Sequence, residues 1–306
     1  MPDIILHHYP QSPVSEKIRV VLGIKGLDWR SVEIPRLPPK PELMPLTGGY
    51  RLTPVMQIGA DIFCDSLCIA RAIQERHPEP TLYPGGGDGM AWGVSRWTDG
   101  PFFQTALEVV FGAEHQRMPP EFVRDRGRIY FGSDWNMERL AADLANSIVR
   151  LRAQFGWVEE RLATGRKFML GDAPGLPDAL AWCLAWFIRG RWDGGPDFLS
   201  QFPNLCAWEE RVKAIGHGNP ADMASGEALE VARASEPGTP ETPDPGDPRG
   251  LKPGDTVTVT PDNGGFAVDG QVLSLRRHEV AILREDERVG RVAVHFPTVG
   301  YRVERA

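Results

Sequence analysis

The first 77 residues alternate between strand-like and helix-like segments, and this order constrains the fold more than any other feature of the sequence. An apolar run at 3–8 is followed by residues 15–26, where apolar side chains recur at helical spacing before a glycine. Residues 28–34 then alternate as a half-buried strand does. The β-α-β order predicts two parallel strands joined by a right-handed crossover.

The remainder of the first 77 residues predicts a β-hairpin and a helix. Two short apolar runs at 53–59 and 61–65 are separated by Gly59 and Ala60, which is a hairpin signal. Residues 66–77 return to helical spacing. Residues 1–77 are therefore predicted to form one α/β domain.

A second domain, all helical, is predicted over residues 87–232. Apolar residues recur in steps of three or four through 136–165, where Asp134 is the expected N-cap and Gly165 the expected stop. Residues 178–190 are apolar on every side, which is typical of a helix buried at the centre of a bundle.

The last part of the sequence predicts a linker and a small β domain. Residues 233–250 alternate proline with acidic and small residues, so we expect an extended linker with little to bury. Residues 251–306 contain five short β-like runs separated by turn residues. This pattern predicts a small, highly bent all-β domain of the SH3-like barrel type.

Charge, hydropathy and cysteine content exclude several classes of protein. The formal net charge of −7 disfavours a general nucleic-acid or membrane-surface role, and no stretch is long and apolar enough for a membrane span or signal peptide. The four cysteines are too few and too irregularly spaced for a disulfide scaffold or a zinc site. We expect reduced thiols, no bound metal and a cytoplasmic protein.

Four stretches, in this order, resemble the cytosolic glutathione S-transferase family, and its bacterial serine-type members in particular. They are "SPVSEKIRVVLGIKGL" from 12, "LTPVMQIGADIFCDS" from 52, "GDAPGLPDALAW" from 171 and "FPNLCAWEERVKAI" from 202. The resemblance covers residues 3–225. It implies a thioredoxin-like N-terminal domain followed by an all-helical domain, to which residues 251–306 are an addition.

The resemblance implies two glutathione-binding elements in the first domain. Thr53 and Pro54 would be joined by a cis bond and present the main chain of Thr53 to the cysteinyl residue. Ser66 would bind the γ-glutamyl carboxylate at a helix N-terminus, which favours anions, and Asp65 would pair with the ammonium group. A strand-opening proline and an ordinary helix cap are the structural alternatives for these residues.

The resemblance places the active-site serine or cysteine seven residues before an arginine, which makes Ser12 the candidate catalytic residue. Its hydroxyl would donate a hydrogen bond to the glutathione sulfur, and together with the helix dipole it would favour thiolate over thiol. Tyr9 is the alternative, because some classes of the family use a tyrosine at the end of the first strand. A plain N-cap is the structural alternative for Ser12.

The chain departs from the family pattern at two places. Many members carry Lys or Gln two residues before the cis-proline to contact the glycyl end of glutathione, whereas this chain has Leu52, and Arg51 is the nearest cation. In the helical domain the usual Ser or Thr of the reciprocal cap is Gly175, which leaves only Asp178.

The resemblance implies a homodimeric transferase of detoxification, which activates glutathione, its co-substrate, for attack on a small hydrophobic electrophile. Five aromatic residues within 92–111 are expected to supply part of the electrophile pocket. The alternatives are a glutathione-dependent isomerase, lyase or peroxidase of the same fold, or a non-catalytic binding protein. Acidic and basic residues are balanced in 251–306, so no nucleic-acid partner is expected.

Overall fold

The computed structural model describes residues 3–306, which form two compact units. The first unit contains the residues up to Ile18, Leu27–Arg76 and Asn219–Ala306, and the second contains Arg19–Gly26 and His77–Gly218. Both ends of the described chain therefore belong to the same unit. This division differs from the predicted one, because the segment from 219 to 232 belongs to the first unit and not to the helical one.

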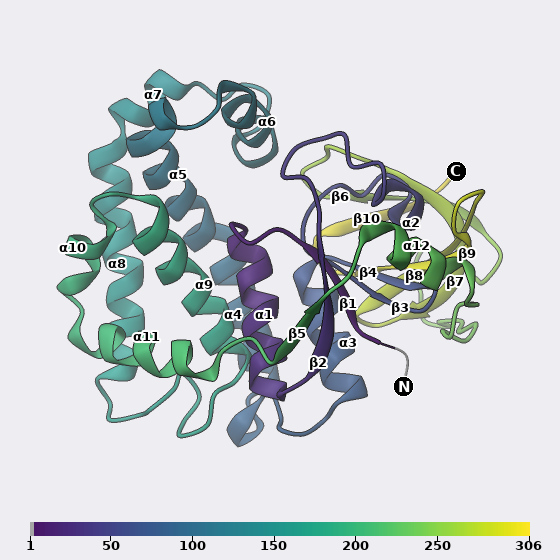
Figure 1. The fold of residues 1–306 in the computed structure, drawn as a ribbon, viewed down its shortest axis with the longest axis horizontal. Helices are drawn as coiled ribbons and strands as arrows, with labels where there is room; N and C mark the ends of the chain where they lie inside the picture. Colours follow the sequence, from purple (N-terminus) through teal and green to yellow (C-terminus); the bar gives the residue numbers. More distant parts are fainter. Residues whose placement is uncertain (1–2) are drawn as a thin grey trace. The chain divides into compact units, whose positions relative to one another are not determined.

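One ten-stranded sheet runs through the first unit, in the order β10-β6-β7-β8-β9-β4-β3-β1-β2-β5 (Figure 1). The strands are β1 (Ile5–His8), β2 (Asp28–Glu33), β3 (Val55–Ile58), β4 (Asp61–Cys64), β5 (Asn219–Asp222), β6 (Thr256–Pro261), β7 (Val268–Arg276), β8 (Glu279–Asp286), β9 (Gly290–Pro297) and β10 (Tyr301–Arg305). β1 and β2 are parallel, and β3 and β4 form an antiparallel hairpin that turns at Gly59, where φ is +61°. The predicted parallel pair and hairpin are confirmed.

Four helices accompany this sheet. They are α1 (Pro13–Lys25), of which the part after Ile18 is assigned to the second unit, α2 (Met44–Thr47), α3 (Ser66–Arg76) and α12 (Ser225–Arg233). α3 lies against β3, β4 and β9, and α12 lies against β2 and β9. The α-helical order of the first 77 residues is thus as predicted, with α2 in addition.

The five C-terminal strands continue the sheet and do not close into a separate barrel. β9 pairs in parallel with β4, in the register Asp61 with Ala293 and Phe63 with His295, so the four-stranded N-terminal sheet is extended on this side (Figure 1). On the other side β5 pairs in parallel with β2. The five predicted strands are confirmed, whereas the SH3-like barrel is wrong, because the sheet stays open and β9 pairs with β4.

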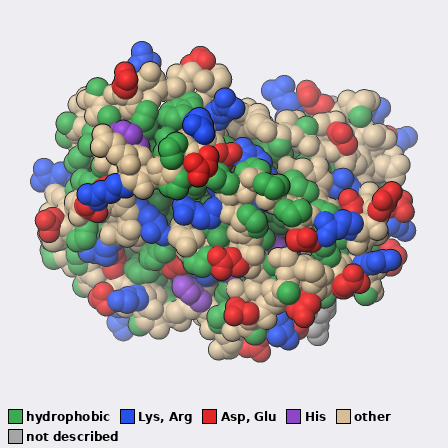
Figure 2. All heavy atoms as spheres, turned by 45° about the horizontal axis from the view of Figure 1, so that its top comes forward, with side chains coloured by type: hydrophobic (Ala, Val, Ile, Leu, Met, Phe, Trp, Pro, Cys, Tyr) green, Lys and Arg blue, Asp and Glu red, His purple; other side chains and the backbone are tan. Residues whose placement is uncertain are grey.

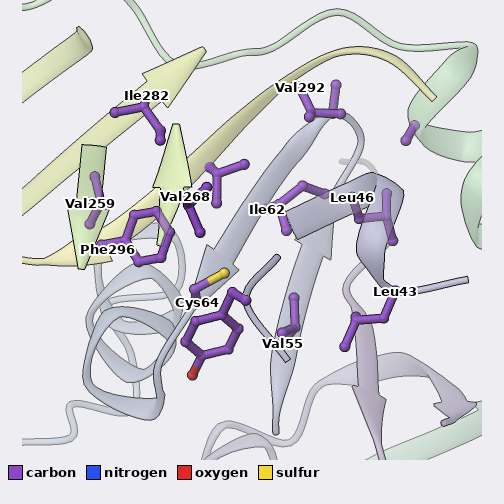
Figure 3. Close-up of a cluster of buried hydrophobic side chains, with 14 of the residues drawn as sticks. Leu43, Leu46, Val55, Ile62, Cys64, Val259, Val268, Ile282, Val292 and Phe296 are labelled. Carbon is purple, nitrogen blue, oxygen red and sulfur yellow. The ribbon is translucent and has the colours of Figure 1, made fainter. Parts of the chain in front are cut away.

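The N-terminal and C-terminal parts of the first unit share one hydrophobic core. Ile62 and Cys64 of β4 and Leu46 of α2 gather with Val268 of β7 and Phe296 of β9 (Figure 3). These five side chains are each at most 0% exposed. Burial of apolar area on this scale is the main stabilising force in folding, so the two parts stabilise each other.

The predicted linker, residues 233–250, is largely extended, but it is also bonded to the sheet. The Gly238 N–H donates to Asp61 Oδ2 over 2.7 Å. The Thr242 N–H donates to the Leu273 carbonyl, and Thr242 accepts from the Leu275 N–H at 2.8 Å. Its hydrogen bonds, and not apolar burial, therefore hold this segment along β7 and β4.

The second unit consists mainly of helices. They are α4 (Asp88–Trp97), α5 (Phe103–Glu114), α6 (Pro120–Phe131), α7 (Met137–Ala142), α8 (Leu144–Leu162), α9 (Leu176–Arg191), α10 (Gly195–Ser200) and α11 (Pro203–Ile215), with short turns at Pro84–Gly86, Thr98–Phe102 and His115–Arg117. α9 contacts α4, α5, α10 and α11 and is buried at most positions, as its apolar sequence predicts. The long helix predicted at 136–165 is interrupted between α7 and α8, and its N-cap is Asn136 and not Asp134.

The surface and the cysteines agree with the composition. Acidic and basic side chains are interspersed on the face shown in Figure 2, without a large patch of one sign. Within residues 3–306 no helix is long and apolar enough to cross a membrane, and no cluster of side chains could hold a metal ion. The four cysteines are free thiols, of which only Cys206 is not buried.

Candidate functional site

The register of three neighbouring strands brings the predicted site residues to one edge of the sheet. Val55, the first residue of β3, pairs with His7 of β1 and with Cys64 of β4. Pro54 therefore lies beside the end of β1, from which the chain runs on to Ser12, and beside the end of β4, from which it runs on to Asp65. Residues distant in sequence thus meet because antiparallel strands fix their neighbours residue by residue.

Ser12 caps the N-terminus of α1. Its N–H donates to the Tyr9 carbonyl, and its Oγ accepts the N–H of Ser15, both over 3.1 Å. Pro13 occupies the first helical position, where its missing N–H costs nothing. Within residues 3–306 the Ser12 hydroxyl accepts this bond but donates none, so its proton is available to a ligand at the helix N-terminus.

Thr53 and Pro54 are joined by a cis peptide bond, as predicted. The Thr53 Oγ1 accepts a hydrogen bond of 3.1 Å from Lys40 Nζ, which also donates to the Arg51 carbonyl at 2.9 Å. The Lys40 ammonium lies 6.0 Å from the centre of the Tyr9 ring, and Tyr9 is buried in the hydrophobic core. A buried cation therefore lies next to the predicted glycyl subsite, close to the main chain of Arg51.

Asp65 precedes α3 in a left-handed conformation, with φ of +74°. It is the one residue other than glycine in the described chain with positive φ. Its N–H donates to the Tyr50 hydroxyl over 3.1 Å, and its Oδ1 accepts the Leu67 N–H over 2.9 Å. Asp65 thus caps α3, as the structural alternative predicts, while its conformation is of the kind that accumulates at functional sites.

Ser66, the first residue of α3, is bonded to a buried lysine. The Nζ of Lys17, on α1, donates to the Ser66 Oγ over 3.0 Å, and Lys17 is only 1% exposed. This contact ties the first turns of α1 and α3 together. It also places a positive charge at a helix N-terminus, where an anionic group is already favoured.

The two histidines at the end of β1 are core residues, as their position in a strand suggests. His7 bonds to Gln57 Oε1 over 2.9 Å, and burial, only partly offset by this bond, lowers the pKa of His7 to about 4. His8 bonds to the Ser31 hydroxyl over 3.0 Å. A neutral, hydrogen-bonded imidazole at position 7 stabilises the strand and has no role in proton transfer near neutral pH.

Comparison with known proteins gives the same answer from an independent direction. A family described as "Glutathione S-transferase, N-terminal domain" matches residues 6–81, and a domain of unknown function matches residues 115–219. A probable glutathione S-transferase of Oryza sativa is 28% identical over 66% of this chain and 81% of its own length. A GST-like protein from Pseudomonas syringae is 36% identical, and its crystal structure covers 100% of both chains with a TM-score of 0.79.

The chain belongs to the glutathione S-transferase family. Its fold is the thioredoxin-like domain and helical domain of that family, as predicted, followed by the β-rich region. A glutathione S-transferase structure from Rhodospirillum rubrum, 19% identical with a TM-score of 0.52, covers only 69% of this chain. The C-terminal strands are therefore shared with the Pseudomonas syringae protein, which covers the whole chain, but not with every transferase fold.

Several residues of this transferase site were missed at the level of sequence. Lys17 lies four residues before Val21 on the inward face of α1, so its burial could have been read from helical spacing. Lys40 follows two prolines and carries no periodic signal. Tyr50 and Tyr301 contact Asp65 from positions far apart in sequence, and no local pattern connects them.

The five aromatic residues within 92–111 divide between core and partly open positions. Phe102 and Phe111 are at most 2% exposed and belong to the core of the second unit. Trp97 stacks on Phe102 with ring centres 4.9 Å apart, and Phe103 packs edge-on against Tyr130 at 5.6 Å. Trp97 and Phe103 are only half-buried, so they remain candidates for contact with an apolar ligand.

Proposed function

We propose that this protein is a glutathione S-transferase that binds glutathione at the edge where β1, β3 and β4 meet. The observation that carries the proposal is the convergence of Ser12, the Thr53–Pro54 turn and the Asp65–Ser66 helix start at one edge of the sheet. Each element offers a different kind of group: a hydroxyl, a strand-like main chain and a helix N-terminus. Together they match the thiol, the peptide backbone and the charged end of glutathione.

Ser12 is the proposed activating residue. Its unused hydroxyl proton would hydrogen-bond the glutathione sulfur, and the α1 N-terminus would add a favourable field, so both would stabilise the thiolate over the thiol. Each unit by which the thiol pKa falls corresponds to about 1.4 kcal/mol. Tyr9, the alternative, is less suited because its ring is part of the hydrophobic core, beneath Lys40.

The remaining contacts distribute the charges of glutathione. Ser66, supported by Lys17, would take the γ-glutamyl carboxylate, and Asp65 would take the ammonium group. For the glycyl carboxylate we add Lys40 to Arg51, because Lys40 is the cation bonded to Thr53. In the reaction the thiol proton leaves to water, the thiolate sulfur forms a bond to the electrophilic carbon, and the leaving group departs with its electron pair.

The proposal is tested by affinity and by turnover. We expect the full chain to be retained on glutathione resin, to elute with free glutathione and to conjugate a chloronitroarene. Absence of both retention and turnover would refute a glutathione-dependent function. Retention without turnover, tested also with peroxide and ether substrates, would favour the isomerase, lyase, peroxidase or binding-protein alternatives.

A cytoplasmic homodimer, which the family resemblance implies, remains part of the proposal. The structure limits how such a dimer could form. β4 is covered by β9 and β2 by β5 within the described chain, so neither strand is free to pair with a second copy. Association through helices is the remaining route, and sedimentation velocity would measure it.

A further inference from the structure

The C-terminal strands reach the candidate glutathione site through the pairing of β9 with β4. Phe63, two residues before Asp65, pairs with His295 of β9. After β9 the chain turns and enters β10, whose first residue is Tyr301. The Tyr301 hydroxyl donates a hydrogen bond to Asp65 Oδ2 over 3.2 Å. A residue that lies outside the family's two common domains therefore touches the carboxylate at the start of α3.

Asp65 is held by three hydrogen bonds, from three directions. Tyr301 binds one carboxylate oxygen, the Leu67 N–H binds the other, and the Tyr50 hydroxyl accepts the Asp65 N–H. A residue with a side chain rarely adopts φ of +74° without such support. Of the three bonds, only the one from Tyr301 both comes from the C-terminal strands and acts directly on the carboxylate.

An aromatic cluster fixes the position of the Tyr301 hydroxyl. The Tyr301 ring packs against Phe296 with centres 5.4 Å apart, and Tyr50 packs edge-on against Phe266 at 5.0 Å and against Phe296 at 6.1 Å. Phe296 is fully buried in the shared core (Figure 3). Burial and the neighbouring acidic groups raise the pKa of Tyr301 well above its usual value, so its hydroxyl remains a neutral donor.

We propose that Tyr301 is a positioning residue of the glutathione site, which orients the Asp65 carboxylate toward the amino group of the γ-glutamyl residue. The inference rests on the proposed function, because it assigns the C-terminal strands a part in the same site. An acidic group that is held in place binds an ammonium group more tightly than a mobile one, since less rotational freedom is lost on binding. The C-terminal region then completes the ligand site of its own chain.

The test uses the full chain and compares Tyr301→Phe with wild type by isothermal titration calorimetry. The substitution removes only the hydroxyl and leaves the ring in its cluster. We expect the Kd for glutathione to rise about tenfold, the size of one hydrogen bond to a charged group. The KM for glutathione should rise by the same factor, with kcat unchanged within about twofold. Tyr83→Phe, at the turn before α4, is the matched control and should leave both constants unchanged.

A ligand without the amino group separates positioning from general support of the fold. Glutaryl-cysteinyl-glycine keeps both carboxylates and the thiol of glutathione but lacks the amine. We expect Tyr301→Phe to leave the Kd for this analogue unchanged, and its effect on glutathione to vanish in an Asp65→Asn background, where the two substitutions are coupled. Equal weakening of both ligands, or no change for glutathione, would overturn the inference. If wild type binds neither ligand, the proposed function itself fails.

Discussion

Ser12 and Ser15 are three residues apart at the start of α1, and their hydroxyl groups are in different situations. The Ser12 Oγ accepts one hydrogen bond and keeps its proton for a ligand. The Ser15 Oγ is fully buried and has no hydrogen-bond partner within residues 3–306. A hydroxyl in the second situation contributes nothing to stability, whereas one in the first can act on a bound sulfur.

We therefore predict that Ser12→Ala lowers kcat/KM for conjugation at least about tenfold, the equivalent of one unit of thiol pKa. Retention on glutathione resin should persist, because the other contacts remain. The pH-rate profile should move to higher pH as the bound thiol becomes harder to ionise. Ser15→Ala is the matched control and should retain full activity. Unchanged turnover in Ser12→Ala would transfer the role to Tyr9.

His295 forms a buried cluster of charges between β4, β8 and β9. Its two ring nitrogens lie 3.1 Å from Asp61 Oδ1 and 3.1 Å from Glu279 Oε1. Burial alone would lower the pKa of His295, but the bonds and charges of the two carboxylates outweigh it, so the pKa is raised. Burial likewise opposes ionisation of Asp61 and Glu279, but His295 and further hydrogen bonds lower both pKa values.

These directions predict how stability depends on pH. A raised folded-state pKa means that the contribution of His295 is present below its unfolded-state pKa of about 6.5 and is lost as pH rises through the folded-state value. The contributions of Asp61 and Glu279 are present above about pH 4 and are lost as pH falls through their folded-state values. Urea unfolding should therefore give the largest free energy between about pH 5 and 6.5.

Substitution of the central imidazole tests the same cluster. His295→Gln leaves two carboxylates buried without their cation, which should cost about 3–5 kcal/mol of unfolding free energy and remove the loss of stability above neutral pH. His278→Gln, an exposed histidine at the turn between β7 and β8, is the control and should change little. A His295→Gln protein as stable as wild type would show that the cluster does not support β9 against β4.

At the scale of elements, the start of α9 explains why the expected Ser or Thr cap is a glycine. A Cβ at Gly175 would lie 2.7 Å from Pro84 Cδ and 2.8 Å from the Leu82 carbonyl oxygen. The cap is instead made by Asp178, whose carboxylate accepts the N–H groups of Gly175 and Met169 and the indole N–H of Trp208. Burial raises the pKa of Asp178 to about 6, although these bonds oppose the rise.

Gly175→Ser is therefore predicted to destabilise the protein even though it restores the preferred capping residue. The close contacts are with backbone and a proline ring, which cannot move aside, so we expect a loss of about 1–3 kcal/mol in urea unfolding. Gly87→Ser, at the N-cap of α4, is the matched control, because a Cβ there meets only Leu170 at 3.6 Å. It should leave stability unchanged or raise it by a few tenths of a kcal/mol. Equal stability of the two variants would contradict the steric argument.

Local patterns predicted most elements but not how distant elements pair. The strand at 3–8, the hairpin around Gly59 and the helix of residues 178–190 follow from periodicity and turn residues, which act over a few positions. Nothing near Phe63 indicates that His295 will pair with it, and an isolated β-like tail is equally compatible with a closed barrel. For the same reason Ser12 and Ser66 could be proposed from the family motifs, whereas the contact of Tyr301 with Asp65 needed the structure.

At the scale of the whole molecule, the shared core predicts that the C-terminal strands cannot be removed. A chain ending after residue 250 would expose the paired edge of β4 and leave the apolar surface of Ile62 and Leu46 uncovered. We expect it to be insoluble, or to unfold at much lower urea concentration than wild type, because an open edge and an uncovered core favour aggregation. Val299→Ser, which alters an exposed side chain between β9 and β10, is the control. A truncated chain with the midpoint of wild type would show two independent domains.

The pairing of β9 with β4 also sets an order of events during synthesis. β4 leaves the ribosome early, but its neighbour is among the last segments to be translated. At roughly 5–20 residues per second, the N-terminal sheet waits on the order of ten seconds or more for the strand that covers it. The helical unit is translated within that interval and can fold first, so the nascent chain carries an open strand edge until translation is almost finished.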